Sequence, residues 1–157
     1  MKILFCSAGK AHETYVKQGI SDFTSRVNKY FSAEWLLIAP PKNAYSMSED
    51  ELKKKEAKNI LSAFRADDYI VLLDERGKQM SSADLAIFMQ QRANESIKRI
   101  VFLIGGAYGV NEAVIKKANY TWSLSKLVFP HMLVRLILAE QVYRACTILR
   151  NEKYHHA

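Results

Sequence analysis

Residues 100–109 read IVFLIGGAYG, and this stretch gives the clearest indication of the fold. Its first five residues form a continuous apolar run, which is typical of a strand buried on both faces of a parallel sheet. The glycines that follow allow a sharp turn at the end of the strand. Three earlier runs have the same character, and we expect each to form a strand: Ile3–Ala8, Trp35–Ala39 and Tyr69–Leu73.

Helical patterns lie between these strands. Apolar residues recur at helical spacing over residues 15–31, and residues 49–64 change from charged to apolar along their length. Ser81 and Asp84 have the spacing of a capping box at the start of a third helix. The alternation of strands and helices predicts one α/β domain over residues 1–157, in which helices flank a parallel sheet.

Shorter elements complete the pattern. Asn111 is a suitable N-cap for a fourth helix that ends near Lys117, and a fifth strand is expected around residues 120–124. Residues 40–47, which contain two prolines, are expected to form a long irregular loop.

The last helix, over about residues 131–150, is apolar around most of its circumference. A surface of this kind needs burial on more than one side. Either the helix is sandwiched within one subunit, or a second copy of the chain covers part of it in an isologous homodimer. We favour the homodimer.

Positive charge is concentrated in the last part of the chain. Residues 113–157 contain seven Lys or Arg and two acids, and the whole chain has a net charge of +7. Such a segment favours a polyanionic partner, RNA rather than DNA, although a solvated surface has a similar composition. The two cysteines lie in apolar surroundings, and no stretch is long and apolar enough for a membrane helix. We therefore expect a cytoplasmic protein that does not bind a membrane.

Three segments follow strands and would meet at the carboxyl edge of the sheet, where ligands bind in such folds. The segment 73–78 is charged. The segment 105–109 lacks the glycine spacing of dinucleotide and phosphate loops, so it is either a tight structural turn or a contact for another ligand. The segment 123–129 either connects a strand to a helix or offers backbone groups to the edge of an adenine. His131 and Arg135 would follow on one helical face.

The sequence has no metal-ligand spacing and no nucleophile elbow. We therefore expect neither metal-dependent nor covalent hydrolytic chemistry.

Four motifs together resemble the ribosomal RNA large subunit methyltransferase H family, a minimal branch of the SPOUT class. The resemblance extends from the first residue to the final histidine, and only the combination is specific. The motifs are LIGGAYG at 103–109, SLSKLVFPHMLVR at 123–135, EQVYRA at 140–145 and the Tyr154-His155 tail.

The resemblance implies a SPOUT fold with a deep trefoil knot at the carboxyl end, a homodimer, and S-adenosylmethionine as the methyl donor, with S-adenosylhomocysteine as the product. It also implies the positions of the cofactor contacts, which are Leu73, Gly105, Leu124, Ser125, Lys126, Leu127, Val128 and Phe129.

The reaction implied by the resemblance is methylation of N3 of a pseudouridine in 23S ribosomal RNA, within the assembled 70S ribosome. On the side of the target base, the candidate catalytic residues are His131, Arg135, Tyr154 and His155. Arg135 would stabilise the developing anion of the base, and a histidine or water would take the proton. Two other readings stay open: a non-catalytic RNA- or ribosome-binding protein of the same fold, and a SPOUT methyltransferase for transfer RNA.

Overall fold

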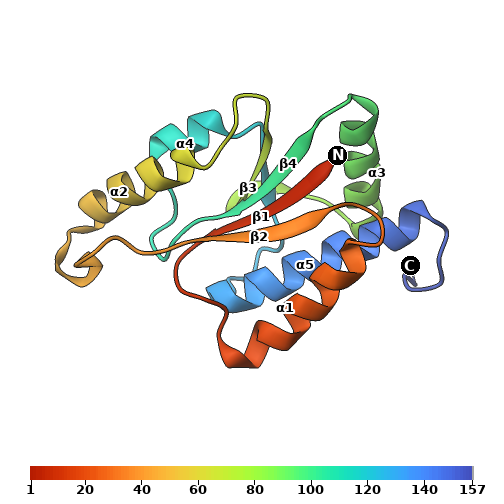
Figure 1. Ribbon diagram of the computed structural model, residues 1–157, viewed down its shortest axis with the longest axis horizontal. Helices are drawn as coiled ribbons and strands as arrows, with labels where there is room; N and C mark the ends of the chain where they lie inside the picture. Colours follow the sequence, from red (N-terminus) through yellow and green to blue (C-terminus); the bar gives the residue numbers. More distant parts are fainter. Residues whose placement is uncertain (157) are drawn as a thin grey trace.

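The computed structural model describes residues 1–156, and five parallel strands form its central sheet in the order β2-β1-β4-β3-β5 (Figure 1). The two long apolar runs β1 and β4 lie next to each other in the middle of this order. The strands are β1 (Lys2–Ala8), β2 (Ala33–Ile38), β3 (Tyr69–Gln79), β4 (Arg99–Ile104) and β5 (Tyr120–Ser123).

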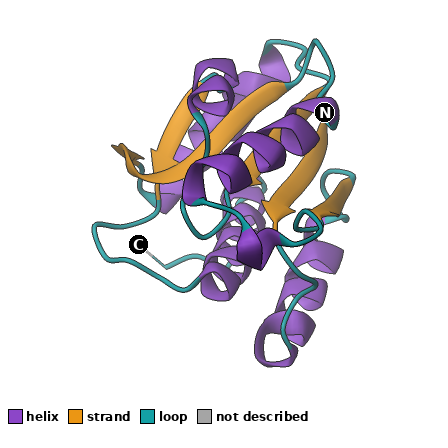
Figure 2. Cartoon of the chain, turned by 90° about the vertical axis from the view of Figure 1, so that its left-hand side faces the viewer, coloured by secondary structure: helices purple, strands orange, loops and turns teal. Residues whose placement is uncertain are grey.

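Helices cover both faces of the sheet (Figures 1 and 2). One face packs against α1, α3 and α5, and the other against α2 and α4. Every residue of β4 is buried as a result, which explains why the strand is continuously apolar after Arg99 instead of alternating. The helices are α1 (Thr14–Val27), α2 (Glu49–Ser62), α3 (Ser82–Asn94), α4 (Glu112–Lys117) and α5 (His131–Leu149).

The starts of several helices agree with the signals in the sequence. Ser81 and Asp84 form the expected capping box at α3, and Asn111 caps α4 by accepting a hydrogen bond from the backbone of Ala113. Ser48 caps α2 in the same way, through the backbone of Glu51. No helix within residues 1–156 is long and apolar enough to cross a membrane.

The last helix, α5, packs against both α1 and α3 within one chain (Figure 1). Leu138, Ala139 and Val142 are fully buried there. Other apolar residues of the helix, including Leu133 and Ile137, stay partly exposed. The subunit core thus accounts for much of its apolar surface, and a remaining strip is available to a second copy.

Two expectations about the chain path were wrong. The strand β3 was expected to end at Leu73 but runs to Gln79, because main-chain pairing with β5 resumes at Lys78 after an irregularity over residues 74–77. Three of these four residues are charged and the fourth is Gly77, so the sequence shows no run of apolar residues there. The supposedly irregular loop contains a short 3-10 helix, Ala44–Ser46, which follows a left-handed Asn43.

Candidate functional site

A pocket of about 550 Å³ lies at the carboxyl ends of β4 and β5 and beside the middle of β3, at the edge where ligands bind in parallel sheets. The three segments identified in the sequence form most of its wall, and the start of α5 closes one side. The lining residues include Leu73, Asp74, Arg76, Gly105, Gly106, Tyr108, Trp122, Leu124, Ser125, Leu127, Val128, Phe129 and His131.

The predicted cofactor contacts therefore gather in one place. Seven of the eight line the pocket, and Lys126 is the exception, since its exposed side chain lies in the same loop without lining the cavity. The structure brings these residues together from β3, from the turn after β4 and from the loop after β5.

The glycine turn after β4 is both tight and part of the pocket. The backbone N–H of Gly109 donates to the carbonyl of Gly106 at 3.0 Å, and Gly109 has a φ of +80°, which disfavours other residues. A Cβ on Gly105 would lie 2.6 Å from a methyl group of Val110. The segment is therefore a tight structural turn whose backbone forms a wall of the cavity, and its contact with a ligand stays a prediction.

The loop between β5 and α5 is held by its own serines. The Ser123 hydroxyl donates to the carbonyl of Ser125 at 2.9 Å, and the Ser125 hydroxyl accepts from the backbone N–H of Leu127 at 3.0 Å. Leu127 and Val128 are 70% and 79% exposed, so this ordered loop places apolar side chains at the rim of the pocket. Such a rim suits a ligand that has both an apolar ring and polar edges.

The indole N–H of Trp122, in the wall of the pocket, is a buried hydrogen-bond donor. Its side chain is 3% exposed and packs edge-on against Phe102, with ring centroids 6.1 Å apart. Its Nε1–H finds no acceptor among the described residues. Because an unpaired buried donor is costly, an acceptor atom supplied by a ligand would stabilise this arrangement.

His131 begins α5 and lines the pocket. Burial lowers the pKa of its imidazole, and the Arg135 charge lowers it further, although a hydrogen bond with the backbone of Gly106 acts in the opposite direction. The lowered pKa favours the neutral ring, which is the form that can accept a proton.

Arg135 does not line the pocket, although it lies one helical turn beyond His131. It is 1% exposed, and its guanidinium donates to the Ser7 hydroxyl at 3.0 Å and to the Lys10 carbonyl at 2.9 Å. A third contact, at 3.2 Å, reaches Nδ1 of His12. These groups all belong to β1 and the turn after it, so the guanidinium points away from the cavity.

Tyr154 and His155 fold back against the second half of α5. The Tyr154 hydroxyl donates to the Glu140 carboxylate at 2.9 Å, and Arg144 bridges that carboxylate to Nδ1 of His155. Glu140 lies nine residues beyond His131, about 14 Å along the helix axis. In one chain, therefore, the tail residues and His131 do not meet.

Several pocket residues lie outside the three segments identified in the sequence, among them Lys53, Trp122 and Val134. Lys53 reaches the cavity from α2, and nothing in a run of three lysines marks that one side chain. Tyr108, which belongs to the glycine segment identified in the sequence, is 53% exposed at the pocket. Among residues 1–156, no three His, Cys, Asp or Glu side chains gather as metal ligands would.

Comparison with known proteins gives a consistent result over the whole chain. A family model described as a predicted SPOUT methyltransferase matches residues 1–155. A protein of Cytophaga hutchinsonii named ribosomal RNA large subunit methyltransferase H is 42% identical, over 99% of this chain and 100% of its own. A protein of the same name from Parabacteroides distasonis is also 42% identical, over 99% of each chain.

Solved structures share the fold at low sequence identity. A probable methylase family protein from Haemophilus influenzae superposes with a TM-score of 0.53 at 12% identity, over 99% of this chain and 70% of its own. A probable methyltransferase from Bordetella pertussis has a TM-score of 0.53 at 11% identity, over 92% of this chain and 96% of its own. At this level of identity the likeness concerns the fold alone.

Proposed function

The chain belongs to the SPOUT methyltransferases and, within them, to the ribosomal RNA large subunit methyltransferase H family, and from this premise we propose that it uses S-adenosylmethionine to methylate N3 of a pseudouridine in 23S ribosomal RNA. The proposed substrate is the assembled 70S ribosome, which places the activity in the cytoplasm. The proposal rests mainly on one observation: the glycine turn and the loop after β5 come together in the wall of one pocket.

The residues present fit S-adenosylmethionine. Its adenine would be read by backbone groups of residues 124–129, whose loop is already ordered by Ser123 and Ser125. Gly105 would permit close approach, and Trp122 offers an unpaired buried donor. We also propose the trefoil knot of the SPOUT class at the carboxyl end, on the basis of the family match.

When bound, the donor supplies an electrophilic methyl group on a sulfonium ion, so the protein needs no metal and no covalent nucleophile. The task of the chain is to align the target nitrogen and to help remove its proton. His131 suits the second role, because it lines the pocket and its lowered pKa favours the neutral ring. The Arg135 guanidinium contacts Ser7, Lys10 and His12 and does not line the pocket. We therefore assign it a positioning role, in which it holds the start of α5 against β1.

Tyr154 and His155 require a second copy of the chain to take part. We propose a homodimer in which the tail of one protomer reaches the pocket of its partner; the partly exposed apolar strip of α5 supports such an interface. A heterodimer with one intact cofactor pocket and one intact tail on the other protomer is expected to keep activity. If that heterodimer is inactive while both parent proteins dimerise, the arrangement is wrong.

A transfer assay tests the proposed function. The protein is incubated with radiolabelled S-adenosylmethionine and, separately, 70S ribosomes, isolated subunits and transfer RNA. We expect label in 23S ribosomal RNA, with 70S ribosomes as the best substrate. Binding of RNA without any transfer would instead identify a non-catalytic RNA-binding protein, and label in transfer RNA would identify a different substrate.

A further inference from the structure

A second pocket, of about 510 Å³, lies where α1 and α5 both end. It is formed by the last turn of α1, the turn after it, the far part of α5 and the segment that follows. We call it the arginine–tyrosine pocket, and its lining residues are Arg26, Lys29, Tyr30, Tyr143, Arg150 and Glu152. None of them lines the pocket at the carboxyl edge of the sheet.

Aromatic rings give this pocket its walls. Tyr143 is the central ring, with centroids 4.7 Å from Tyr154, 5.9 Å from Phe23 and 6.4 Å from Tyr30. The side chain of Tyr30 is fixed by donation from its hydroxyl to the Glu152 carboxylate at 2.7 Å. The result is a set of aromatic faces held in place at the surface, which is the usual platform for an unpaired base.

Two guanidinium groups lie on these faces. The Arg26 guanidinium carbon is 5.5 Å from the Tyr143 ring and 5.7 Å from Phe23, and that of Arg150 is 5.5 Å from Tyr30. Stacking holds the plane of a guanidinium and leaves its N–H edge free to bind an anion. Among residues 1–156, Arg26 has one ion pair, with the exposed Asp22 at 3.3 Å, and a side-chain hydrogen bond with Tyr143 raises its pKa.

The charge of the lining is strongly positive. Three cations face one carboxylate, that of Glu152, and this carboxylate already accepts from Tyr30. Among residues 1–156, neither Lys29 nor Arg150 is within ion-pair distance of a carboxylate. Helix dipoles favour cations at the ends of α1 and α5, but they explain neither the aromatic walls nor the hollow between them.

We propose that the arginine–tyrosine pocket binds RNA, with a phosphodiester group at Arg26, Lys29 and Arg150 and the adjoining base against the tyrosines. The proposal rests on the proposed function, because it names a contact for the same RNA substrate. Along α5, Val134 of the cofactor pocket and Tyr143 of the arginine–tyrosine pocket are nine residues apart, about 14 Å, so this pocket holds a nucleotide other than the one that reacts at the cofactor pocket of the same chain.

Binding of 70S ribosomes at several salt concentrations tests this site without any methyl transfer. The double variant Arg26→Gln/Arg150→Gln removes two cations and keeps long polar side chains. We expect affinity to fall about tenfold or more, and the slope of log affinity against log salt to shrink by about 2, as for two lost phosphate contacts. Affinity for S-adenosylmethionine is expected to be unchanged.

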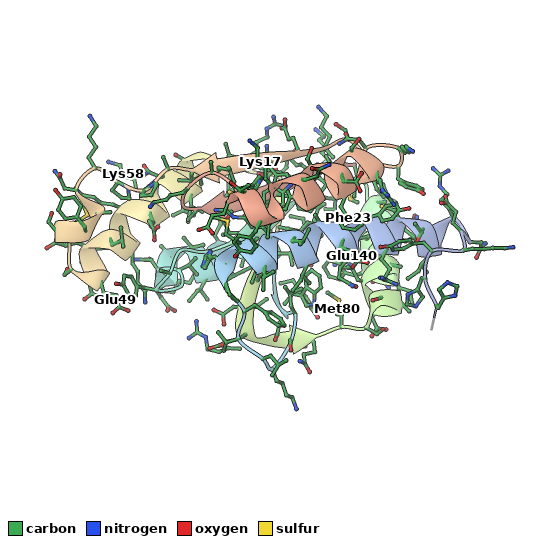
Figure 3. The ribbon with its side chains drawn as sticks, turned by 90° about the horizontal axis from the view of Figure 1, so that it is seen from below. Lys17, Phe23, Glu49, Lys58, Met80 and Glu140 are labelled. Carbon is green, nitrogen blue, oxygen red and sulfur yellow. The ribbon has the colours of Figure 1, made fainter. Side chains whose placement is uncertain are left out.

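The matched control is Lys54→Gln/Lys58→Gln, which removes the same charge from exposed positions on α2, on the other face of the sheet (Figure 3 labels Lys58). Equal binding by the two double variants would overturn the proposal. So would a change in oligomeric state of the Arg26/Arg150 variant with RNA affinity like that of the control, because the pocket would then contact a second copy. If the unaltered protein binds no ribosome and transfers no methyl group, the proposed function fails as well.

Discussion

Nη1 of Arg135 lies 3.2 Å from Nδ1 of His12, in the interior of the subunit and across 123 positions of sequence. Because arginine only donates, the imidazole accepts through Nδ1 and must be neutral in this contact. The ring of His12 also packs edge-on against Trp35, with centroids 4.9 Å apart. Arg135 thereby joins the start of α5 to the turn after β1.

Replacing Arg135 is expected to destabilise the protein. Arg135→Ala leaves the Ser7 hydroxyl and the Lys10 carbonyl without their donor and creates a cavity in the core. We expect the free energy of unfolding to fall by about 2–4 kcal/mol, measured by urea denaturation. The exposed Lys58→Ala is the control and should change it by less than about 0.5 kcal/mol. A loss no larger than that of the control would show that the buried guanidinium is not structural.

The stability of the protein is expected to fall in mild acid. Burial lowers the folded-state pKa of both His12 and His131, with Arg135 contributing in each case and Lys17 at His12. Below the ordinary histidine pKa of about 6.5, the unfolded chain therefore binds more protons than the folded one. The free energy of unfolding should thus decrease as pH drops from 7 to 5 and level off above pH 7.

The variant His12→Gln tests whether His12 contributes to this pH dependence of stability. Its free energy of unfolding should depend less steeply on pH between 5 and 7, whereas His156→Gln, on the exposed tail, should keep the original slope. Identical pH profiles for the original protein and His12→Gln would contradict the assignment.

Gly77 is expected to tolerate no side chain. A Cβ there would lie 2.5 Å from the carbonyl oxygen of Thr121, which is main chain and has little room to move. Gly77→Ala should lower the free energy of unfolding by about 1–3 kcal/mol. Gly19→Ala is the matched comparison, because its Cβ would meet only the tip of the Leu136 side chain at 2.7 Å and alanine favours a helix. Equal losses in thermal or urea melts would mean that β3 and β5 pack less closely here.

Trp122 provides a direct signal for cofactor binding. In a Trp35→Phe protein, Trp122 is the remaining tryptophan, and its fluorescence should change on titration with S-adenosylmethionine, because it lines the pocket with an unpaired Nε1–H. In Trp122→Phe, where Trp35 remains, the signal should not change. The reverse pattern would place the cofactor elsewhere.

The sequence predicted the strands, the sheet type and most of the pocket, because continuous apolar runs and the glycine turn are local signals. It did not reveal the extension of β3 to Gln79, since residues 74–77 are charged and continue the strand only through main-chain pairing with β5. Nor did the sequence reveal which way the side chain of Arg135 points. Helical spacing places that residue beside His131, but its orientation depends on Ser7 and His12, which are distant in sequence and adjacent only after folding.

The most direct test of the proposed function is to map the methylated nucleotide. After reaction of 70S ribosomes from a strain that lacks this activity, 23S ribosomal RNA is digested to nucleosides and fragments and analysed by mass spectrometry. The account predicts one added methyl group, on N3 of a pseudouridine, and none when S-adenosylmethionine is left out. A methyl group on another nucleotide or on ribose, or no methyl group in active ribosomes, would contradict it.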